Sequence, residues 1–342
     1  MVICMTLIFC FFATILGGLS FFLYGMRIIC KSLERLSSTG IQKVLKKATS
    51  NDIKGFFYGA GITALLQSSS TLTVMLVGLV NSDVLSFDST FGIVMGSNVG
   101  TTLTAWIISL SEINETSPFF ALISPEVFTP LLSFAGICLT FISKHPKIQN
   151  VGEIFIGFSI LMYGMDLMSG AINIISGLTF FESLLSSLKS PIFALIVSTI
   201  FTGIIQSSAA TIGIIESLAL SGSLSYQMAI PMVLGANIGT CITAFIASFG
   251  TNKAAKSVVA LHFTVNIIGS LICIAFLYLF GSIFNTLKQI SMSDVALIHT
   301  LFNLFSTVIF IPLKNLLMKL CIAFVGDKKT AIYKPRLFYY NY

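Results

Sequence analysis

The chain has 342 residues, of which 55% are hydrophobic and only 9% are charged. A water-soluble chain of this length cannot hide so much apolar surface, because a large share of any folded surface must face water. The composition therefore excludes a soluble globular protein and predicts an all-α polytopic membrane protein. The net charge of +6 does not indicate nucleic-acid binding, because the basic residues lie in short connectors and near the C-terminus, as in cytoplasmic loops. The seven scattered cysteines form neither a disulfide framework nor CxxC metal spacing.

Apolar segments recur along the whole chain, and each is expected to be helical. Their approximate ranges are 3–30, 55–81, 89–110, 119–142, 151–175, 190–220, 227–249, 257–280 and 294–320. The first is not expected to be a signal peptide, because no basic stretch precedes it and no small-residue cleavage site follows. The segments 55–81 and 190–220 are each interrupted in the middle by the sequence Gln-Ser-Ser.

An internal repeat appears when the sequence is aligned with itself at an offset of 139 residues. Tyr-Gly-Met at 24–26 then matches 163–165, and Gln-Ser-Ser at 67–69 matches 206–208. The stretch GSNVGTTLTA at 96–105 matches GANIGTCITA at 235–244, with six of ten positions identical. Three matches at one offset indicate two copies of one unit, which is typical of secondary transporters.

The charges of the loops indicate how the two interrupted segments cross the membrane. If each one enters and leaves on the same side, the basic loops 31–54, 143–150 and 250–256 share one face with the basic C-terminal tail. If both crossed fully, loops 31–54 and 143–150 would lie on opposite faces. Cytoplasmic loops carry the excess of Lys and Arg, so the first arrangement is favoured. Segments 55–81 and 190–220 are therefore predicted to be re-entrant helical hairpins.

Each repeat then has three full crossings, an odd number, so the second repeat is inverted relative to the first. The predicted units are repeat 1 at 1–142 with hairpin 55–81, inverted repeat 2 at 151–280 with hairpin 190–220, an extra crossing at 294–320 and a basic tail at 321–342. This organisation gives about seven full crossings of the cell membrane (plasma or inner). The N-terminus is predicted outside and the C-terminus in the cytoplasm.

Each hairpin tip would place free backbone groups and polar side chains inside the membrane. Hydrocarbon cannot satisfy such a turn, so the tip must face protein or a water-filled cavity. The arms at about 71–81 and 210–220 each direct a helix N-terminus toward the midplane, which favours an anion. Carbonyls and hydroxyls at the tips can also hold a hard cation such as Na⁺. The alternative is that Ser and Thr only hold helices together.

Other polar residues lie in the apolar segments outside the two tips. Oxygen ligands for a cation are offered by Asn98, Thr101, Asn237 and Thr240, whereas the glycines beside them suit either close helix packing or local opening. Glu216 lies in an arm of the second hairpin, where an ionisable group is costly and by default functional. We interpret it as a possible coupling acid that ligates Na⁺ or titrates; the alternative is that it reaches the outer interface.

Basic residues are not expected at the centre of the membrane, so helix dipoles, hydroxyls and bound cations would have to balance the anion. Arg27 and Asp166 occupy equivalent positions in the repeats and are expected to be anchors near the membrane ends. Two i, i+4 pairs share helix faces and are expected to form interhelical hydrogen bonds rather than a proton relay: His262 with Asn266, and His299 with Asn303.

The tips 67–71 and 206–208, together with the two G-x-N-x-G-T stretches, resemble the type II sodium–phosphate cotransporter family, including its bacterial members. The resemblance covers about 15–320 of this chain. It implies Na⁺-coupled symport of inorganic phosphate by alternating access, with substrate and Na⁺ bound between the tips at mid-membrane. Ala209 and Ala210 extend the second tip, and Cys241 stands where the first repeat has Thr102. The site is therefore expected to be lopsided, with the first tip the richer donor.

The resemblance also implies which residues bind the substrates. The phosphate ligands would be Gln67, Ser68, Ser69, Ser70, Gln206, Ser207 and Ser208. The Na⁺ ligands would be Gln67, Ser69, Thr71, Asn98, Thr101, Gln206, Ser208, Asn237 and Thr240. The partners expected are phosphate, Na⁺ and the lipid bilayer, with a homodimer as a further expectation and no nucleic acid.

Three alternatives remain open at this point. A transporter of the same fold could carry another oxyanion or a small organic anion. An anion channel is less favoured, because filters usually form rings of like segments, whereas inverted hairpins suit alternating access. A membrane hydrolase with a Ser nucleophile would need a base near Ser68 or Ser207, and His262 and His299 have no evident acidic orienter. No enzyme activity and no catalytic residue is therefore predicted.

Overall fold

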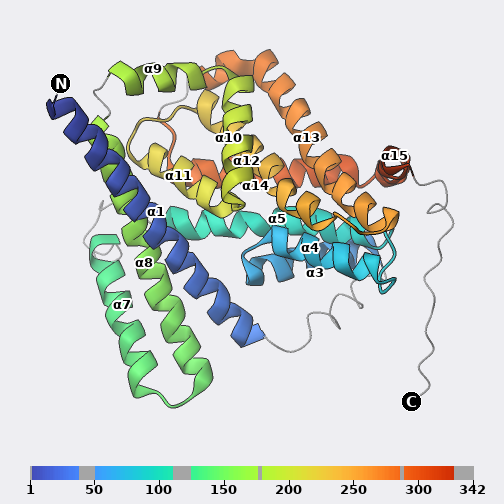
Figure 1. The fold of residues 1–342 in the computed structure, drawn as a ribbon, viewed down its shortest axis with the longest axis horizontal. Helices are drawn as coiled ribbons and strands as arrows, with labels where there is room; N and C mark the ends of the chain where they lie inside the picture. Colours follow the sequence, from blue (N-terminus) through green and yellow to red (C-terminus); the bar gives the residue numbers. More distant parts are fainter. Residues whose placement is uncertain (1, 38–50, 111–124, 176–178, 286–288, 327–342) are drawn as a thin grey trace.

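The computed structural model describes residues 2–37, 51–110, 125–175, 179–285 and 289–326, which form helices and connections without any strand (Figure 1). The helices, in chain order, are α1 (Val2–Ser37), α3 (Asp52–Leu66), α4 (Ser69–Asn81), α5 (Thr90–Ser109), α7 (Pro125–Ile142), α8 (Pro146–Ile175), α9 (Thr179–Leu188), α10 (Pro191–Ile205), α11 (Ser208–Leu220), α12 (Tyr226–Ala247), α13 (Lys253–Asn285), α14 (Met292–Phe310) and α15 (Lys314–Val325). The prediction of an all-α polytopic membrane protein is confirmed. The basic tail lies mostly outside the described residues.

Six of the described helices are long and apolar enough to cross a membrane. They lie within α1, α5, α8, α12, α13 and α14. The sequence predicts a seventh crossing at 119–142, but residues 111–124 lie outside the described part, and the apolar stretch of α7, Val127–Ile142, is shorter than a full span. The short amphipathic helix α9 was not predicted.

The predicted single crossing at 294–320 is wrong, because two helices occupy this range. α14 ends at Phe310, a turn follows, and α15 begins at Lys314. Pro312 stands in this turn, and proline has no backbone N–H for a helical hydrogen bond and clashes with the preceding turn. The candidate span in this range is α14 alone.

Helices α1 and α8, which begin the two predicted repeats, pack along each other in opposite directions (Figure 1). A Cβ on Gly18 would meet the backbone of Gly164, and a Cβ on Gly25 would meet the backbone of Gly157. Gly25 and Gly164 are the glycines of the two Tyr-Gly-Met motifs, so these motifs mark a close antiparallel helix crossing. An inverted repeat requires this relation between its first helices; inversion of the whole second half stays a prediction.

The interrupted segments each form two helices with a break at the Gln-Ser-Ser motif. α3 and α4 are separated by Gln67 and Ser68, and each boundary of α10 and α11 lies 139 residues after its counterpart. The first helix of each pair packs closely on the crossing that follows, α3 on α5 and α10 on α12. A Cβ on Gly96 would collide with the Phe56 carbonyl, and one on Gly235 with the Leu195 carbonyl. These glycines therefore serve close helix packing.

Candidate functional site

The first tip owes its shape to two adjacent residues with different backbone conformations. Gln67 ends α3 in the left-handed region, with φ 52° and ψ 27°. Ser68 is extended and caps α4, because its hydroxyl accepts a hydrogen bond of 3.2 Å from the Thr71 amide. The hydroxyls of Ser68 and Thr71 also lie 2.9 Å apart. One helix thus ends and the next begins within two residues. That each such pair is a re-entrant hairpin stays a prediction, and we keep the name hairpin for α3 with α4 and for α10 with α11.

The second tip repeats this backbone with fewer hydroxyls. Gln206 ends α10 in the left-handed region, with φ 59° and ψ 25°. Ser207 is extended, and its hydroxyl accepts 3.2 Å from the amide of Ala210. Ala210 occupies the position of Thr71, so the second tip has no counterpart of the hydroxyl pair of Ser68 and Thr71. The second tip therefore offers fewer hydroxyl groups than the first, as the sequence predicted.

The two tips share the wall of a cavity of about 370 Å³, which we call the tip cavity. It is lined by Leu23, Met26, Arg27, Cys30, Leu66, Gln67, Ser68, Ser69, Ser70, Thr71, Gln206, Ser207, Ser208 and Ala209. Every phosphate ligand expected from the resemblance is in this set. The N-termini of α4 and α11 meet there, and free amides with the positive end of a helix dipole favour an anion. The structure thus brings together, from segments 139 residues apart, a polar cavity suited to a small oxyanion.

The two tip glutamines differ in how they are held. Gln67 is buried; its amide group donates to the Ala64 carbonyl, and its carbonyl oxygen accepts from the Thr104 hydroxyl at 2.7 Å. Gln206 is exposed. The counterpart of Thr104 is Thr243, whose buried hydroxyl has no hydrogen-bond partner within the described part of the chain. Gln67 is therefore held in place by hydrogen bonds to its neighbours, whereas the side chain of Gln206 is available to the cavity.

The repeated asparagines Asn98 and Asn237 are the interhelical partners of the two predicted histidines. His262 Nε2 lies 3.1 Å from Asn98 Oδ1 and joins α13 to α5. His299 Nε2 lies 3.2 Å from Asn237 Oδ1 and joins α14 to α12. The expectation of interhelical hydrogen bonds is confirmed. α13 thus contacts α5, and α14 contacts α12, through asparagines at equivalent positions of the two repeats.

Several expected Na⁺ ligands do not line the tip cavity. Asn98 and Asn237 are in the histidine contacts, while the hydroxyls of Thr101 and Thr240 donate to carbonyls of their own helices. A role for these residues in binding Na⁺ stays a prediction. Glu216 is fully buried on α11. The alternative in which Glu216 reaches the outer interface is therefore wrong.

Arg27 is the residue whose placement departs most from expectation. The sequence suggested an anchor near the membrane end, but Arg27 lines the tip cavity. The expectation that only helix dipoles, hydroxyls and cations would surround the tips did not include this guanidinium group. One sequence signal could have revealed it, because Arg27, Lys31 and Arg35 follow each other at intervals of four residues and so share one face of α1.

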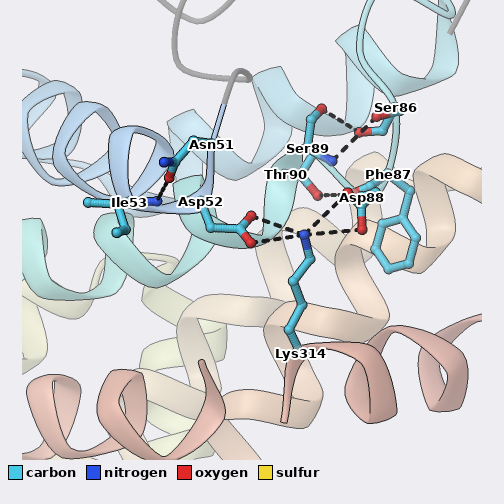
Figure 2. A network of polar contacts seen from close by, with 9 residues as sticks. All are labelled: Asn51, Asp52, Ile53, Ser86, Phe87, Asp88, Ser89, Thr90 and Lys314. Atoms are coloured by element: carbon cyan, nitrogen blue, oxygen red, sulfur yellow. Dashed lines mark hydrogen bonds and ion pairs between the residues drawn. The ribbon is translucent and has the colours of Figure 1, made fainter. Parts of the chain in front are cut away.

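An ion-pair network holds the base of the first hairpin at some distance along α3 from its tip. Lys314, at the start of α15, contacts Asp52 at 3.0 Å and Asp88 at 3.1 Å (Figure 2). Burial lowers the pKa of Lys314, but hydrogen bonds and attraction from the two carboxylates outweigh this, so that the pKa is raised. At the other end of the hairpin, the Asn252 amide donates 2.8 Å to the Asn81 side chain. The first hairpin is thus fixed at both of its outer ends.

The six candidate spans define the class of molecule as a multi-pass membrane protein, in which two broken helices share the wall of a polar cavity. A profile of the Na⁺/Pi-cotransporter family matches the chain twice, at residues 21–170 and 160–292. The chain belongs to this family, and the resemblance noted from the sequence is confirmed.

Curated proteins similar to this chain carry names of three kinds. It is 30% identical to an uncharacterised protein, YqeW of Bacillus subtilis, over 88% of this chain and 94% of that protein. It is 24% identical to the putative inorganic phosphate export protein YjbB of Escherichia coli, over 92% of this chain but 56% of YjbB. A shorter match, 32% identical over 33% of this chain and 17% of the relative, is to human sodium-dependent phosphate transport protein 2B. No solved structure matches the chain.

Proposed function

We propose that this protein is a secondary active transporter that carries inorganic phosphate together with Na⁺ and binds both between the two tips. The observation that carries the proposal is the tip cavity, because two helix N-termini and the hydroxyls of Ser68 and Ser207 converge in it. Family membership supports phosphate as the oxyanion and Na⁺ as the coupling ion. The transporter family argues against an enzyme.

The chemistry of the cavity suits a phosphate ion. Phosphate oxygens accept hydrogen bonds, and the cavity offers hydroxyl donors, backbone N–H groups at two N-termini and one guanidinium group. Na⁺ favours oxygen ligands, which the hydroxyls and carbonyls of the tips provide. Each bound Na⁺ also lowers the cost of bringing a multiply charged anion out of water, which gives a physical reason for coupling.

The direction of transport has two candidates. Uptake follows if an inward Na⁺ gradient drives the symport. Export has the support of the name of the YjbB relatives. It is also supported by the face of α1 that carries Arg27, Lys31 and Arg35, since the loop at 31–54, which follows this face, is predicted to be cytoplasmic. We propose symport as the mechanism in both cases, since the imposed ion gradients set the net direction of a coupled carrier.

Transport of labelled phosphate in proteoliposomes tests the proposal. We expect phosphate to accumulate when an inward Na⁺ gradient is imposed and not when K⁺ replaces Na⁺. Vesicles loaded with phosphate should release it faster when Na⁺ is present inside, which tests the reverse direction. Folded protein that moves phosphate in neither experiment would contradict the proposed function, and accumulation of sulfate in place of phosphate would favour another oxyanion.

A further inference from the structure

Arg27 belongs to two neighbouring cavities, one of which is the tip cavity. The second has a volume of about 530 Å³ and is lined by Tyr24, Arg27, Ile28, Lys31, Arg35, Glu153 and Ile156. Because Arg27 lines both, the second cavity adjoins the tip cavity along the face of α1 that carries the three basic residues. Their spacing places them on successive turns of the helix. We call Arg27, Lys31 and Arg35 the basic face of α1.

The charges on the basic face are only partly balanced. Arg35 forms an ion pair of 2.9 Å with Glu153, which also accepts a hydrogen bond of 2.5 Å from Ser32. Within the described residues, neither Arg27 nor Lys31 has an ion pair or a hydrogen-bond partner. A cation in a membrane span is costly unless it meets water, a cavity or an opposite charge. Glu153 also lines the second cavity, but it is paired with Arg35, so the positive charges of Arg27 and Lys31 lie at the cavity walls without an ion pair of their own among the described side chains.

We infer that Arg27 is a direct phosphate-binding residue of the tip cavity and that Lys31 guides the anion to it through the second cavity. The inference rests on the proposed function. The guanidinium group can donate two parallel hydrogen bonds to phosphate oxygens, which a Lys ammonium cannot reproduce. Lys31 attracts the anion as a point charge one helical turn away. The residue equivalent to Arg27 in the second half is Asp166, so the second half has no counterpart of this basic residue.

The competing explanation is that Arg27 only anchors α1. The span within α1 ends at Leu33, so Arg27 lies about 9 Å inside that end at 1.5 Å per residue, and a long side chain can extend that far toward the interface. An anchor needs only a positive charge and a flexible stem. A phosphate ligand needs the guanidinium geometry, so Arg27→Lys separates the two roles.

Equilibrium binding of ³²P-labelled phosphate to purified full-length protein, at fixed Na⁺, tests the inference. Four variants are compared with the unaltered protein: Arg27→Gln, Arg27→Lys, Lys31→Gln and the control Lys147→Gln. Lys147 is exposed and lines neither cavity, so its change alters net charge alone. Arg27→Gln should weaken phosphate binding about tenfold or more, because it removes a charge-assisted hydrogen bond. Arg27→Lys should recover only part of this loss.

Lys31→Gln should leave the equilibrium affinity within about twofold and slow association at low salt, an effect that should fade as salt rises. The control should bind as the unaltered protein does. Equal affinity of Arg27→Gln and the unaltered protein would overturn the inference while leaving the proposed function intact, and so would full recovery in Arg27→Lys. Absence of phosphate binding in the unaltered protein would overturn the proposed function, and this inference with it. Size-exclusion profiles identify any variant that fails to fold, and Arg27→Lys then carries the test alone.

Discussion

The two hairpin tips have the same backbone but different support from the rest of the molecule. Gln67 and Gln206 share the left-handed conformation, and Ser68 and Ser207 each cap the next helix. Gln67 is buried and bonded to Thr104, whereas Gln206 is exposed and the hydroxyl of Thr243 has no partner in the described residues. Two segments with the same backbone can therefore be held by different side-chain contacts.

The outer ends of the two hairpins also differ, and again the first hairpin has contacts that the second lacks. The first hairpin is tied by Lys314 to Asp52 and by Asn252 to Asn81. The positions equivalent to Asp52 and Asn81 are Pro191 and Leu220, which cannot form these contacts. Within the second hairpin, the hydroxyls of Thr202 on α10 and Thr211 on α11 lie 2.8 Å apart and join its two helices. The comparison predicts a first hairpin that is fixed and a second hairpin that is freer to move.

The largest effect is expected from Gln67→Ala and Gln206→Ala. Each should reduce phosphate transport to background, because both side chains line the tip cavity. Only Gln67→Ala should also lower the free energy of unfolding, by about 1–3 kcal/mol, since it leaves the buried Thr104 hydroxyl without its acceptor. Gln206→Ala should change it by no more than about 0.5 kcal/mol. Phosphate uptake into proteoliposomes measures the first effect, and unfolding in detergent measures the second. Near-normal uptake in both variants would mean that the tips are structural only.

The second prediction compares the equivalent threonines. Thr104→Val removes the donor to Gln67 and should cost about 1–2 kcal/mol of stability. Thr243→Val removes a buried hydroxyl that has no partner and should be neutral or stabilising. The two substitutions are chemically identical, so each is the control for the other. Equal losses of stability would contradict the proposed difference between the halves.

A smaller effect is expected from Lys314→Met. The ion pairs are partly exposed, so the loss of stability should be about 1 kcal/mol and should shrink as salt rises. Because folding raises the pKa of Lys314, its contribution is present below the unfolded pKa near 10.5 and is lost as the pH rises through the higher folded value. Unfolding of Lys314→Met and of the exposed control Lys147→Met, measured in low and high salt, tests this. Equal stability of both variants would show that the network contributes nothing.

The smallest expected difference concerns motion in the unaltered protein. Amide hydrogen exchange should be faster in α10 and α11 than in α3 and α4, because fewer side-chain contacts fix the outer ends of the second hairpin. Mass spectrometry of peptides from the four helices gives the comparison. Faster exchange in α3 and α4 would reverse our assignment of the fixed and the mobile hairpin.

Much of this arrangement could be read from the sequence, because membrane constraints are strong and local. Apolar length located the spans, and the Gln-Ser-Ser motifs marked the breaks in both interrupted segments. The family resemblance then named all seven phosphate candidates that line the tip cavity. The extra crossing was placed too far toward the C-terminus, because hydropathy alone does not register the break at Pro312.

What could not be predicted depends on which faces of distant helices meet. The sequence indicated that Arg27 is an anchor near a membrane end, and only the packing of α1 beside both tips places it in the cavity. The partners of His262 and His299 come from other helices, so the i, i+4 spacing could not identify Asn98 and Asn237. The contact between Thr104 and Gln67 likewise needs α5 to pack on α3.

The central claim is that one oxyanion binds between the two tips, and locating a heavy analogue of phosphate tests it most directly. Crystals of the full-length protein soaked with arsenate and Na⁺ can be measured at the arsenic absorption edge. The account predicts a single anomalous peak in the tip cavity, between the hydroxyls of Ser68 and Ser207 and within hydrogen-bond reach of Arg27. A peak elsewhere, in protein that binds arsenate in solution, would contradict it.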